Sequence, residues 1–300
     1  MNVLQGVVIA SLSGFCYVRT DDEVAGAVES LECKPRGKVK SADRIIVGDR
    51  VAVTRIDEKT GIIEKIYPRK NQLLRPVIAN VDQVVIVMAI KNPDLNLYLA
   101  DRFLLQAETQ HLDVLVCLNK CDLAAPKEVK AAARHFEAAG YRVLATEAVH
   151  NVGQRRLRAL LAGRISVVAG PSGAGKSALL NMVEPGFGLR TGSISEKIGR
   201  GKHTTRHTSL HALKAGGFVA DTPGFTQLDI VGVSAVDLAS YFREFAGMAD
   251  QCRFRGCVHV SEPNCAIKAA VADGTIRSER YEHYTHFYQE LIDQEKRRFH

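Results

Sequence analysis

The sequence predicts an α/β domain with a doubly wound parallel sheet, preceded by a small all-β barrel and followed by a mainly helical segment. Three observations support this prediction. Short β-rich runs fill the start of the chain, and apolar runs alternate with helical patterns in its middle. Mixed aromatic and charged residues surround a cluster of cysteine and histidine near its end. We therefore expect three domains, formed by residues 1–70, 71–230 and 231–300.

The first domain reads as strands without a helix. Short runs rich in β-branched and aromatic residues are separated by turns that contain Gly, Asp and Lys. The run Ile46–Val51 is similar to the entry of a strand in OB-fold barrels, which commonly bind oligonucleotides. We predict an OB-fold RNA-binding barrel, with a barrel used only for packing as the alternative. Its expected strands are Gly6–Ala10, Phe15–Val18, Arg50–Thr54 and Gly61–Ile66.

The middle domain contains the continuous apolar runs Val84–Met88 and Val114–Leu118, and a third, mostly apolar run at Ile165–Ala169. Such runs are typical of parallel strands that are buried on both faces. Helical patterns stand between them, and Gly140 ends one of these patterns. The predicted helices cover residues 98–110, 127–139 and 154–162.

A phosphate-binding loop follows the third apolar run. Residues 170–177 match G-x-x-x-x-G-K-[ST] in full, with a predicted strand before them and a helix after them. Glycines let backbone N–H groups converge on phosphate oxygens, and the N-terminus of the helix favours negative charge. We expect Lys176 to contact the β- and γ-phosphates and Ser177 to bind Mg²⁺. The predicted phosphate-binding residues are Gly170, Pro171, Ser172, Gly173, Ala174, Gly175, Lys176 and Ser177.

A second motif, Asn119-Lys120-Cys121-Asp122, follows the apolar run Val114–Leu118. Guanine presents two adjacent donors, N1–H and the exocyclic amine, which one carboxylate accepts together. We assign this carboxylate to Asp122. Asn119 is expected to bond the base and the neighbouring loop, and the stem of Lys120 to lie along the base. Beside a phosphate loop, this motif favours GTP over ATP, and it precedes that loop in a circularly permuted order.

Two further segments complete the predicted nucleotide site. Asp221–Gly224 follows a predicted strand, so Asp221 is placed to hold Mg²⁺ through water and the Gly224 N–H to contact the γ-phosphate. The charged, glycine-containing loop 199–206 offers Thr204 or Thr205 to the Mg²⁺ shell, and we favour Thr205. The segment Thr146–Ala148 is expected to cover the guanine from its other side.

The residue that activates water is not the usual one. Phe225 follows Gly224, at a place where Ras-like enzymes carry a glutamine that orients water. Phenylalanine has no group for this task, so His203 is the predicted catalytic residue. We expect slow hydrolysis until a partner orders the loop. The alternative is that His203 is a solvated loop residue or an RNA contact.

Four soft metal ligands lie within residues 252–265. Three thiols and one imidazole form a closed tetrahedral set that suits one structural Zn²⁺ ion, although the spacing lacks the usual pairs of cysteines. A set without an open position argues against catalytic zinc. The predicted zinc ligands are Cys252, Cys257, His259 and Cys265.

Charge and composition restrict the partners. The formal net charge is +7, which favours a polyanion, and basic residues gather in Arg155–Arg158 and Arg200–Arg206. The alternative for the first of these runs is a solvated helix face. No run of about 18 apolar residues occurs, so no membrane partner is expected. We expect a cytoplasmic monomer.

Over its whole length the chain resembles the RsgA family, also called YjeQ or YloQ, of GTPases that depend on the small ribosomal subunit. The resemblance rests on Gly170–Ser177, Gly201–Thr205, Asp221–Phe225 and the Cys/His set. It implies an OB barrel, a permuted GTPase domain and a zinc domain. It also implies a factor in late assembly of the small subunit that contacts ribosomal RNA and hydrolyses GTP when the subunit stimulates it.

Two other functions remain as alternatives. A metabolic P-loop kinase would need an acceptor pocket and no guanine-reading residue, so Asp122 argues against it. An RNA-binding scaffold with regulatory nucleotide binding would turn over little GTP. Against this alternative stand the intact Lys176, Ser177 and Asp221.

Overall fold

The structure is a computed structural model that describes residues 3–22, 30–37, 44–74, 76–188, 208–221, 230 and 232–298. Two compact units are present. Residues 1–85 and 148–226 form the first unit, and residues 86–147 and 227–300 form the second. The first unit therefore contains the phosphate loop, and the second contains the guanine motif and the Cys/His cluster.

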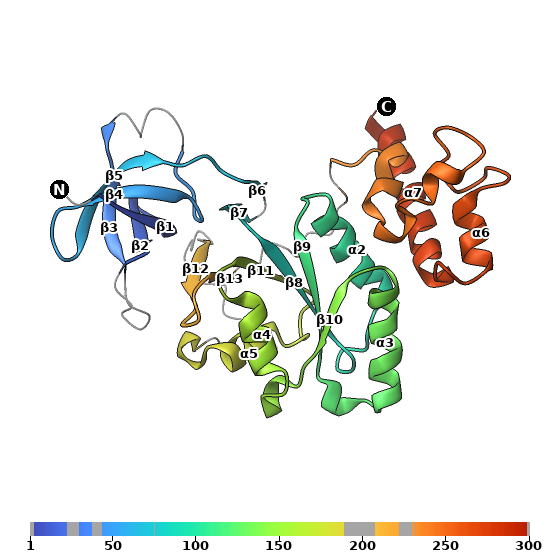
Figure 1. Cartoon of the computed structure of the whole chain (residues 1–300), viewed down its shortest axis with the longest axis horizontal. Helices are drawn as coiled ribbons and strands as arrows, with labels where there is room; N and C mark the ends of the chain where they lie inside the picture. Colours follow the sequence, from blue (N-terminus) through green and yellow to red (C-terminus); the bar gives the residue numbers. More distant parts are fainter. Residues whose placement is uncertain are drawn as a thin grey trace. The chain divides into compact units, whose positions relative to one another are not determined.

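The first unit begins with a closed barrel in the strand order β1-β2-β3-β5-β4 (Figure 1). Its interior is filled by side chains that alternate along the strands, among them Val8, Val18, Val53 and Ile63, each with no exposed surface. The predicted OB-like barrel is confirmed. Its strands are β1 (Val3–Leu12), β2 (Phe15–Thr20), β3 (Leu31–Pro35), β4 (Arg50–Arg55) and β5 (Thr60–Ile66).

A short hairpin of β6 (Gln72–Leu74) and β7 (Val77–Ala79) follows the barrel and is bonded to it. The N–H of Ala79 donates to the carbonyl of Val47 at 2.8 Å. The backbone approaches so closely here that a Cβ on Gly48, whose φ is +90°, would lie 2.1 Å from the carbonyl oxygen of Ala79. Only glycine fits this position, because both its conformation and the space around it exclude a side chain.

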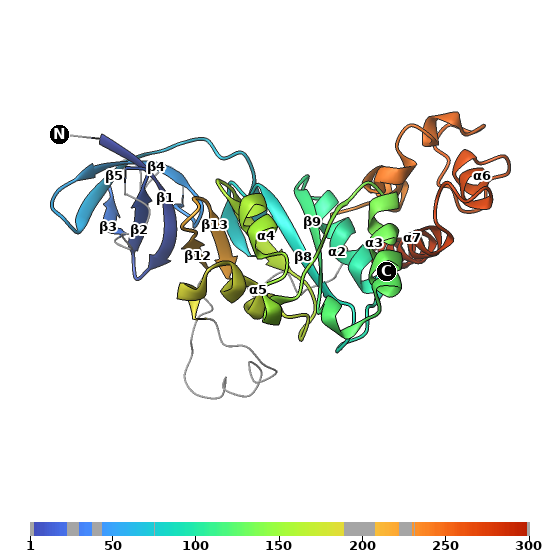
Figure 2. The same ribbon diagram turned by 60° about the horizontal axis from the view of Figure 1, so that its bottom comes forward.

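The phosphate-loop part of the first unit carries three strands in the order β11-β13-β12. Strands β11 (Ile165–Ala169) and β13 (Phe218–Asp221) are parallel, as expected, whereas β12 (Ser209–Ala212) is an antiparallel edge strand that the sequence did not reveal. Figure 2 shows helices α4 (Gln154–Leu161) and α5 (Lys176–Val183) beside these strands.

In the second unit the strands have the order β10-β9-β8. Strand β8 (Gln83–Ala89) is buried along its whole length, as its continuous apolar run predicts. Strands β9 (Asp113–Asn119) and β10 (Arg142–Ala145) are parallel. Helix α2 (Leu97–Glu108) connects β8 to β9, and helix α3 (Pro126–Ala138) connects β9 to β10. The side chain of Asn96 caps α2 by accepting from the N–H of Leu99.

The end of the chain is helical, as predicted. Three 3₁₀ segments, η6 (Ala235–Tyr241), η7 (Arg243–Phe245) and η8 (Ala249–Gln251), precede α6 (Ala266–Ala272) and α7 (Ser278–Arg298). An aromatic core of Phe242, Phe245, Tyr284 and Phe287 joins them. Among the described residues, no helix combines the length and the apolar character needed to cross a membrane.

Candidate nucleotide-binding and metal sites

The predicted phosphate loop connects β11 to the N-terminus of α5. Three of its glycines have positive φ angles, +134° at Gly170, +79° at Gly173 and +93° at Gly175, so the backbone makes a sequence of turns that other residues rarely adopt. Gly175 directly precedes α5, whose first residues are Lys176 and Ser177. The loop therefore presents the unpaired N–H groups of a helix N-terminus where an anion is favoured.

Lys176 is held at the mouth of this loop. Its Nζ donates to the carbonyl oxygens of Gly170 and Pro171, at 2.9 and 2.8 Å. An ammonium group has three donors, so one is left for a phosphate oxygen. Burial lowers the pKa of Lys176, and a bound phosphate would favour the charged form again.

In the second unit, Asn119 ends strand β9 and is 1% exposed. Its Oδ1 lies 3.1 Å from the hydroxyl of Thr146, which is itself fully buried. The carbonyl of Thr146 also accepts from the N–H of Cys121 at 3.3 Å. The described contacts of Thr146 thus hold Asn119 and Cys121 of the guanine motif, and the expected covering of the base by Thr146–Ala148 stays a prediction.

Two further residues of the motif, Lys120 and Asp122, differ in their surroundings. Lys120 has a left-handed backbone (φ 58°), and its Nζ donates to the carbonyl oxygen of Asn92 in the loop after β8. Asp122 lies in the middle of the 3₁₀ turn η1 (Cys121–Leu123) and is exposed. The Lys120 side chain is thus held by a described hydrogen bond, whereas the Asp122 side chain is exposed.

The other predicted nucleotide residues lie mostly outside the described part of the chain. These are His203, Thr204, Thr205, Gly224 and Phe225. Asp221 is the last residue of β13, at the carboxyl end of a parallel strand, where α/β sheets bind ligands.

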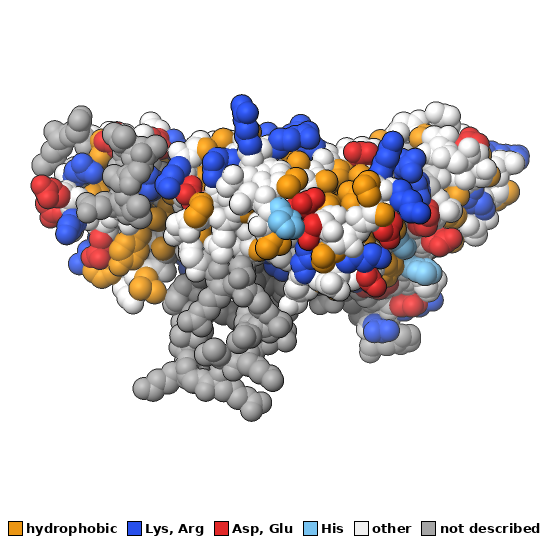
Figure 3. Space-filling model, turned by 90° about the horizontal axis from the view of Figure 1, so that it is seen from below, with side chains coloured by type: hydrophobic (Ala, Val, Ile, Leu, Met, Phe, Trp, Pro, Cys, Tyr) orange, Lys and Arg blue, Asp and Glu red, His pale blue; other side chains and the backbone are white. Residues whose placement is uncertain are grey.

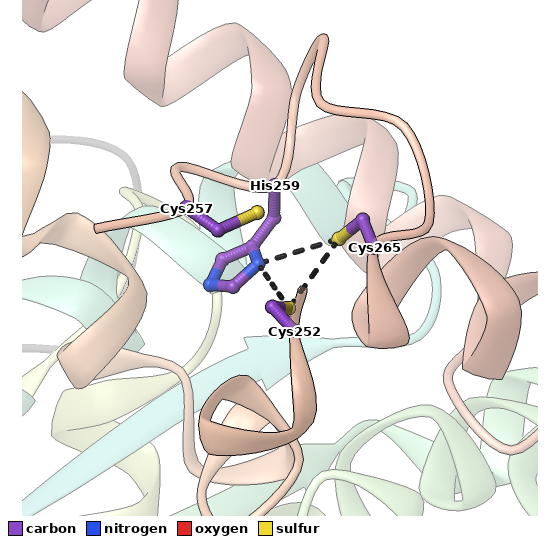
Figure 4. A group of neighbouring side chains, drawn as sticks. All are labelled: Cys252, Cys257, His259 and Cys265. Atoms are coloured by element: carbon purple, nitrogen blue, oxygen red, sulfur yellow. Dashed lines mark hydrogen bonds between the residues drawn. The ribbon is translucent and has the colours of Figure 1, made fainter. Parts of the chain in front are cut away.

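The four predicted zinc ligands come together (Figure 4). Their ligand atoms all lie within 4.8 Å of one another. The Sγ atoms of Cys252 and Cys265 are 3.9 Å apart, and Nδ1 of His259 lies 3.5 and 3.4 Å from them. Tetrahedral zinc with bonds of about 2.3 Å to sulfur and about 2.0 Å to nitrogen places such pairs about 3.8 and 3.5 Å apart. The set therefore fits one tetrahedral ion.

The chemistry of the donors also fits a cation. Burial and the neighbouring thiols of Cys265 and Cys252 raise the pKa of Cys257 to about 12, so the thiol of Cys257 stays protonated unless a metal ion stabilises its thiolate. Burial lowers the pKa of His259, which favours the neutral ring that a metal binds.

Side chains outside the Cys/His set hold the zinc loop, which is the segment between the predicted ligands Cys257 and Cys265. The hydroxyls of Tyr281 and Tyr284 on α7 donate to the carbonyls of His259 and Val258, both at 2.7 Å. The carboxylate of Glu262 accepts from the N–H groups of Val258 and Val260, at 3.0 and 3.1 Å. These bonds hold the backbone between Cys257 and Cys265, and those from the tyrosines attach it to α7.

A buried ionic cluster also escaped the sequence analysis. Asp101 of α2 meets His135 of α3 at 3.2 Å, and Arg280 and His283 of α7 at 2.8 and 2.6 Å. Its sequence signal was a single acidic residue on the otherwise apolar buried face of α2. Such a residue is hard to recognise without the partners that lie far along the chain.

Two family models match this chain. The model described as RsgA GTPase matches residues 66–231, and the model described as RsgA N-terminal domain matches residues 5–63. Among curated relatives, the "Small ribosomal subunit biogenesis GTPase RsgA" of Caldanaerobacter subterraneus subsp. tengcongensis is 42% identical over 100% of this chain and 99% of its own length. The protein of that name from Clostridium beijerinckii is 41% identical over 99% of this chain and 100% of its own length.

Solved structures agree over the whole fold. YjeQ from Thermotoga maritima is 36% identical with a TM-score of 0.83, over 97% of this chain and 99% of its own. YloQ, described as a circularly permuted GTPase, is 33% identical with a TM-score of 0.82, over 98% of this chain and 96% of its own. The expected resemblance and the permuted order of motifs are thus confirmed, and this chain belongs to the RsgA family of GTPases.

Proposed function

We propose that this GTP hydrolase acts in the late assembly of the small ribosomal subunit, in the cytoplasm and as a monomer, and that the subunit stimulates its turnover. One observation carries the proposal: relatives that match the chain over its full length are named small ribosomal subunit biogenesis GTPases. The alternative, an RNA-binding scaffold that binds nucleotide but hydrolyses little, predicts no stimulation.

The base is read in the second unit. The carboxylate of Asp122 accepts from N1–H and the exocyclic amine of guanine. Asn119, which is held by Thr146, bonds the base and the loop. The stem of Lys120, whose ammonium group is fixed on Asn92, lies along the plane of the base.

The phosphates bind to the loop Gly170–Ser177. Backbone N–H groups at the start of α5 contact the oxygens, and Lys176 gives its remaining donor to the β- and γ-phosphates. Ser177, Thr205 and Asp221 would hold Mg²⁺, which neutralises charge on the β- and γ-oxygens when bound. The N–H of Gly224 contacts the γ-phosphate and makes the following segment sensitive to its presence.

Hydrolysis replaces one bond at the γ-phosphorus with another. The oxygen of water bonds to phosphorus while the bond to the β–γ bridging oxygen breaks, so GDP leaves and inorganic phosphate forms. One proton of the water stays on the new phosphate hydroxyl, and the other is released. His203 orients this water or accepts its proton. Phe225, which follows Gly224, has no polar group for the same role.

The barrel of β1–β5 is the proposed contact with ribosomal RNA. The face of the molecule in Figure 3 carries Lys and Arg side chains interspersed with Asp and Glu. Both signs of charge occur on this face, so the net charge of +7 of the whole chain, and not a single basic patch on this face, supplies the attraction to RNA. Because the chain runs from Asp221–Gly224 into residues 231–300, we infer that the nucleotide state also sets the RNA affinity of the zinc domain.

Co-sedimentation with purified ribosomal subunits tests this proposal. We expect the protein to pellet with small but not large subunits, and its affinity to differ between GDP and a non-hydrolysable GTP analogue. Equal affinity in both nucleotide states would remove the proposed switch. No preference for the small subunit would remove the proposed role in its assembly.

A further inference from the structure

The segment between the first two zinc ligands is an exposed tip, residues 253–256. Phe254 at its centre is 44% exposed, and Arg253 and Arg255 on either side are exposed as well. The guanidinium carbon of Arg253 lies 5.6 Å from the centre of the Phe254 ring. Within the described part of the chain, neither arginine forms an ion pair. The tip thus presents one aromatic ring between two unneutralised positive charges.

Both ends of this tip are anchored. On one side the N–H of Ala266 donates to Sγ of Cys252 at 3.4 Å, and the N–H of Cys252 donates to the carbonyl of Ala249 at 3.2 Å. On the other side, Val258 is held by Glu262 and Tyr284, at 3.0 and 2.7 Å. The residues that flank the tip are therefore held in place, which lowers the cost in loop entropy when a ligand binds.

The chemistry of the tip favours single-stranded RNA over a protein. The core of a protein interface needs a broad apolar area. Here the exposed large hydrophobics of the described part of the second unit are single residues in separate elements: Phe254, Leu123 and Val236. One exposed ring suits an unpaired base instead, because every base has a π-face, and guanidinium groups suit the phosphates on either side. An arginine already resting on the ring adds a further stacking surface.

We propose that the tip binds an unpaired base of single-stranded RNA by stacking on Phe254, with Arg253 and Arg255 on the neighbouring phosphates. This deepens the proposed function, in which the zinc domain has an affinity for RNA, since it names the residues of that domain and the base contact that they make. It rests on that function only in naming the RNA of the small subunit as the natural source of the base.

The chain contains no tryptophan, so the fluorescence of a single introduced tryptophan reports on the surroundings of that residue alone. The Phe254→Trp variant, zinc-loaded and full-length, is titrated with a uridine decamer, while anisotropy of a labelled decamer measures total binding. We expect its fluorescence to be quenched in parallel with binding. The Val236→Trp variant places the indole at a residue that is 71% exposed in the same unit, and it should stay unquenched.

Two further variants measure the size of the effect. Phe254→Ala should weaken binding of the decamer by about 5- to 100-fold, from a stacking energy of about 1–3 kcal/mol per base. The double variant Arg253→Gln with Arg255→Gln should lower the magnitude of the slope of log affinity against log salt by about 1.4, from about 0.7 for each phosphate contact of a single strand. Zinc content and GTP turnover without subunits should match the unchanged protein in both, because none of these residues belongs to the nucleotide or metal site.

The outcomes separate this inference from the proposed function. If the Phe254→Trp variant binds the decamer without quenching, the tip is not the contact. If Phe254→Ala weakens binding to small subunits but not to the decamer, the tip docks a protein and the RNA assignment is wrong. If the unchanged protein ignores small subunits while the quenching is present, the tip binds RNA and the proposed function fails.

Discussion

Nη1 of Arg280 lies 2.8 Å from Oδ1 of Asp101, and both side chains are almost completely buried in the second unit. The two residues come from α7 and α2, so the ion pair joins the C-terminal helices to the helix that follows β8 (Figures 1 and 2). Arg280 also donates to both oxygens of Glu244, at 2.6 and 3.1 Å. The second unit is thus stabilised by ion pairs that are almost completely shielded from water.

The same carboxylate has histidine partners that resemble a metal site. Asp101, His135 and His283 bring three ligand atoms within 4.8 Å of one another. The guanidinium of Arg280 already occupies the space beside Asp101 and repels a second cation. The cluster is therefore structural: His135 belongs to α3, which begins shortly after the guanine motif, and His283 belongs to α7, which supports the zinc loop.

Loss of the Asp101 charge should destabilise the second unit strongly. Asp101→Asn removes the carboxylate of Asp101 from the buried Arg280, whose other described ion-pair partner is Glu244, and we expect a loss of about 3–5 kcal/mol in the free energy of unfolding. Denaturant unfolding followed by circular dichroism measures this. The exposed pair of Arg36 and Glu64 is the control, because Arg36→Gln should cost less than about 1 kcal/mol. Equal losses in the two variants would contradict the structural role of the cluster.

The stabilisation by Asp101 should depend on pH in a defined direction. Burial raises the pKa of Asp101, but Arg280, His135 and His283 lower it by more, so the pKa in the folded protein is below its usual value. The stabilisation is then fully present above the unfolded pKa of about 4 and is lost as the pH falls toward the folded pKa. Unfolding of the unchanged protein and of Asp101→Asn is compared at a series of pH values. The difference in stability should narrow below about pH 4, and a constant difference would disprove the linkage.

Nucleotide choice should follow Asp122. In Asp122→Asn the amide can donate to the O2 of xanthine, while the exocyclic amine of guanine loses its acceptor. We expect GTP affinity to fall about 10- to 100-fold, from about 1.5–3 kcal/mol for a hydrogen bond to a charged group, and affinity for xanthosine triphosphate to rise. Equilibrium binding of both nucleotides measures the change, with Asp94→Asn as an exposed control in the loop after β8. Unchanged GTP preference in Asp122→Asn would refute the base-reading role.

Much of this architecture could be predicted because its signals are local. The apolar run of β8 predicts a buried strand, and the spacing of residues in Gly170–Ser177 predicts the loop between β11 and α5. The antiparallel strand β12 was missed, because four residues with mixed burial carry too short a pattern. The cluster of Asp101 with His283 was missed because its partners lie 182 positions apart and no local pattern connects them.

His203 should affect turnover and not binding. His203→Ala removes the group that orients or deprotonates water, so we expect turnover in the presence of subunits to fall at least about 100-fold. Affinity for GTP should stay within about twofold, because the side chain is not assigned to the nucleotide. His111→Ala, an exposed histidine after α2, is the matched control. Stimulated turnover that survives in His203→Ala would show that another residue activates the water.

This permuted GTPase is expected to respond to the small ribosomal subunit. Phosphate release from GTP is measured during titration with purified small subunits and, in parallel, with large subunits. We expect slow turnover by the protein alone and a saturable increase, of at least about tenfold, with small subunits only. Turnover that stays the same at all concentrations of small subunit, or that rises equally with large subunits, would contradict the account.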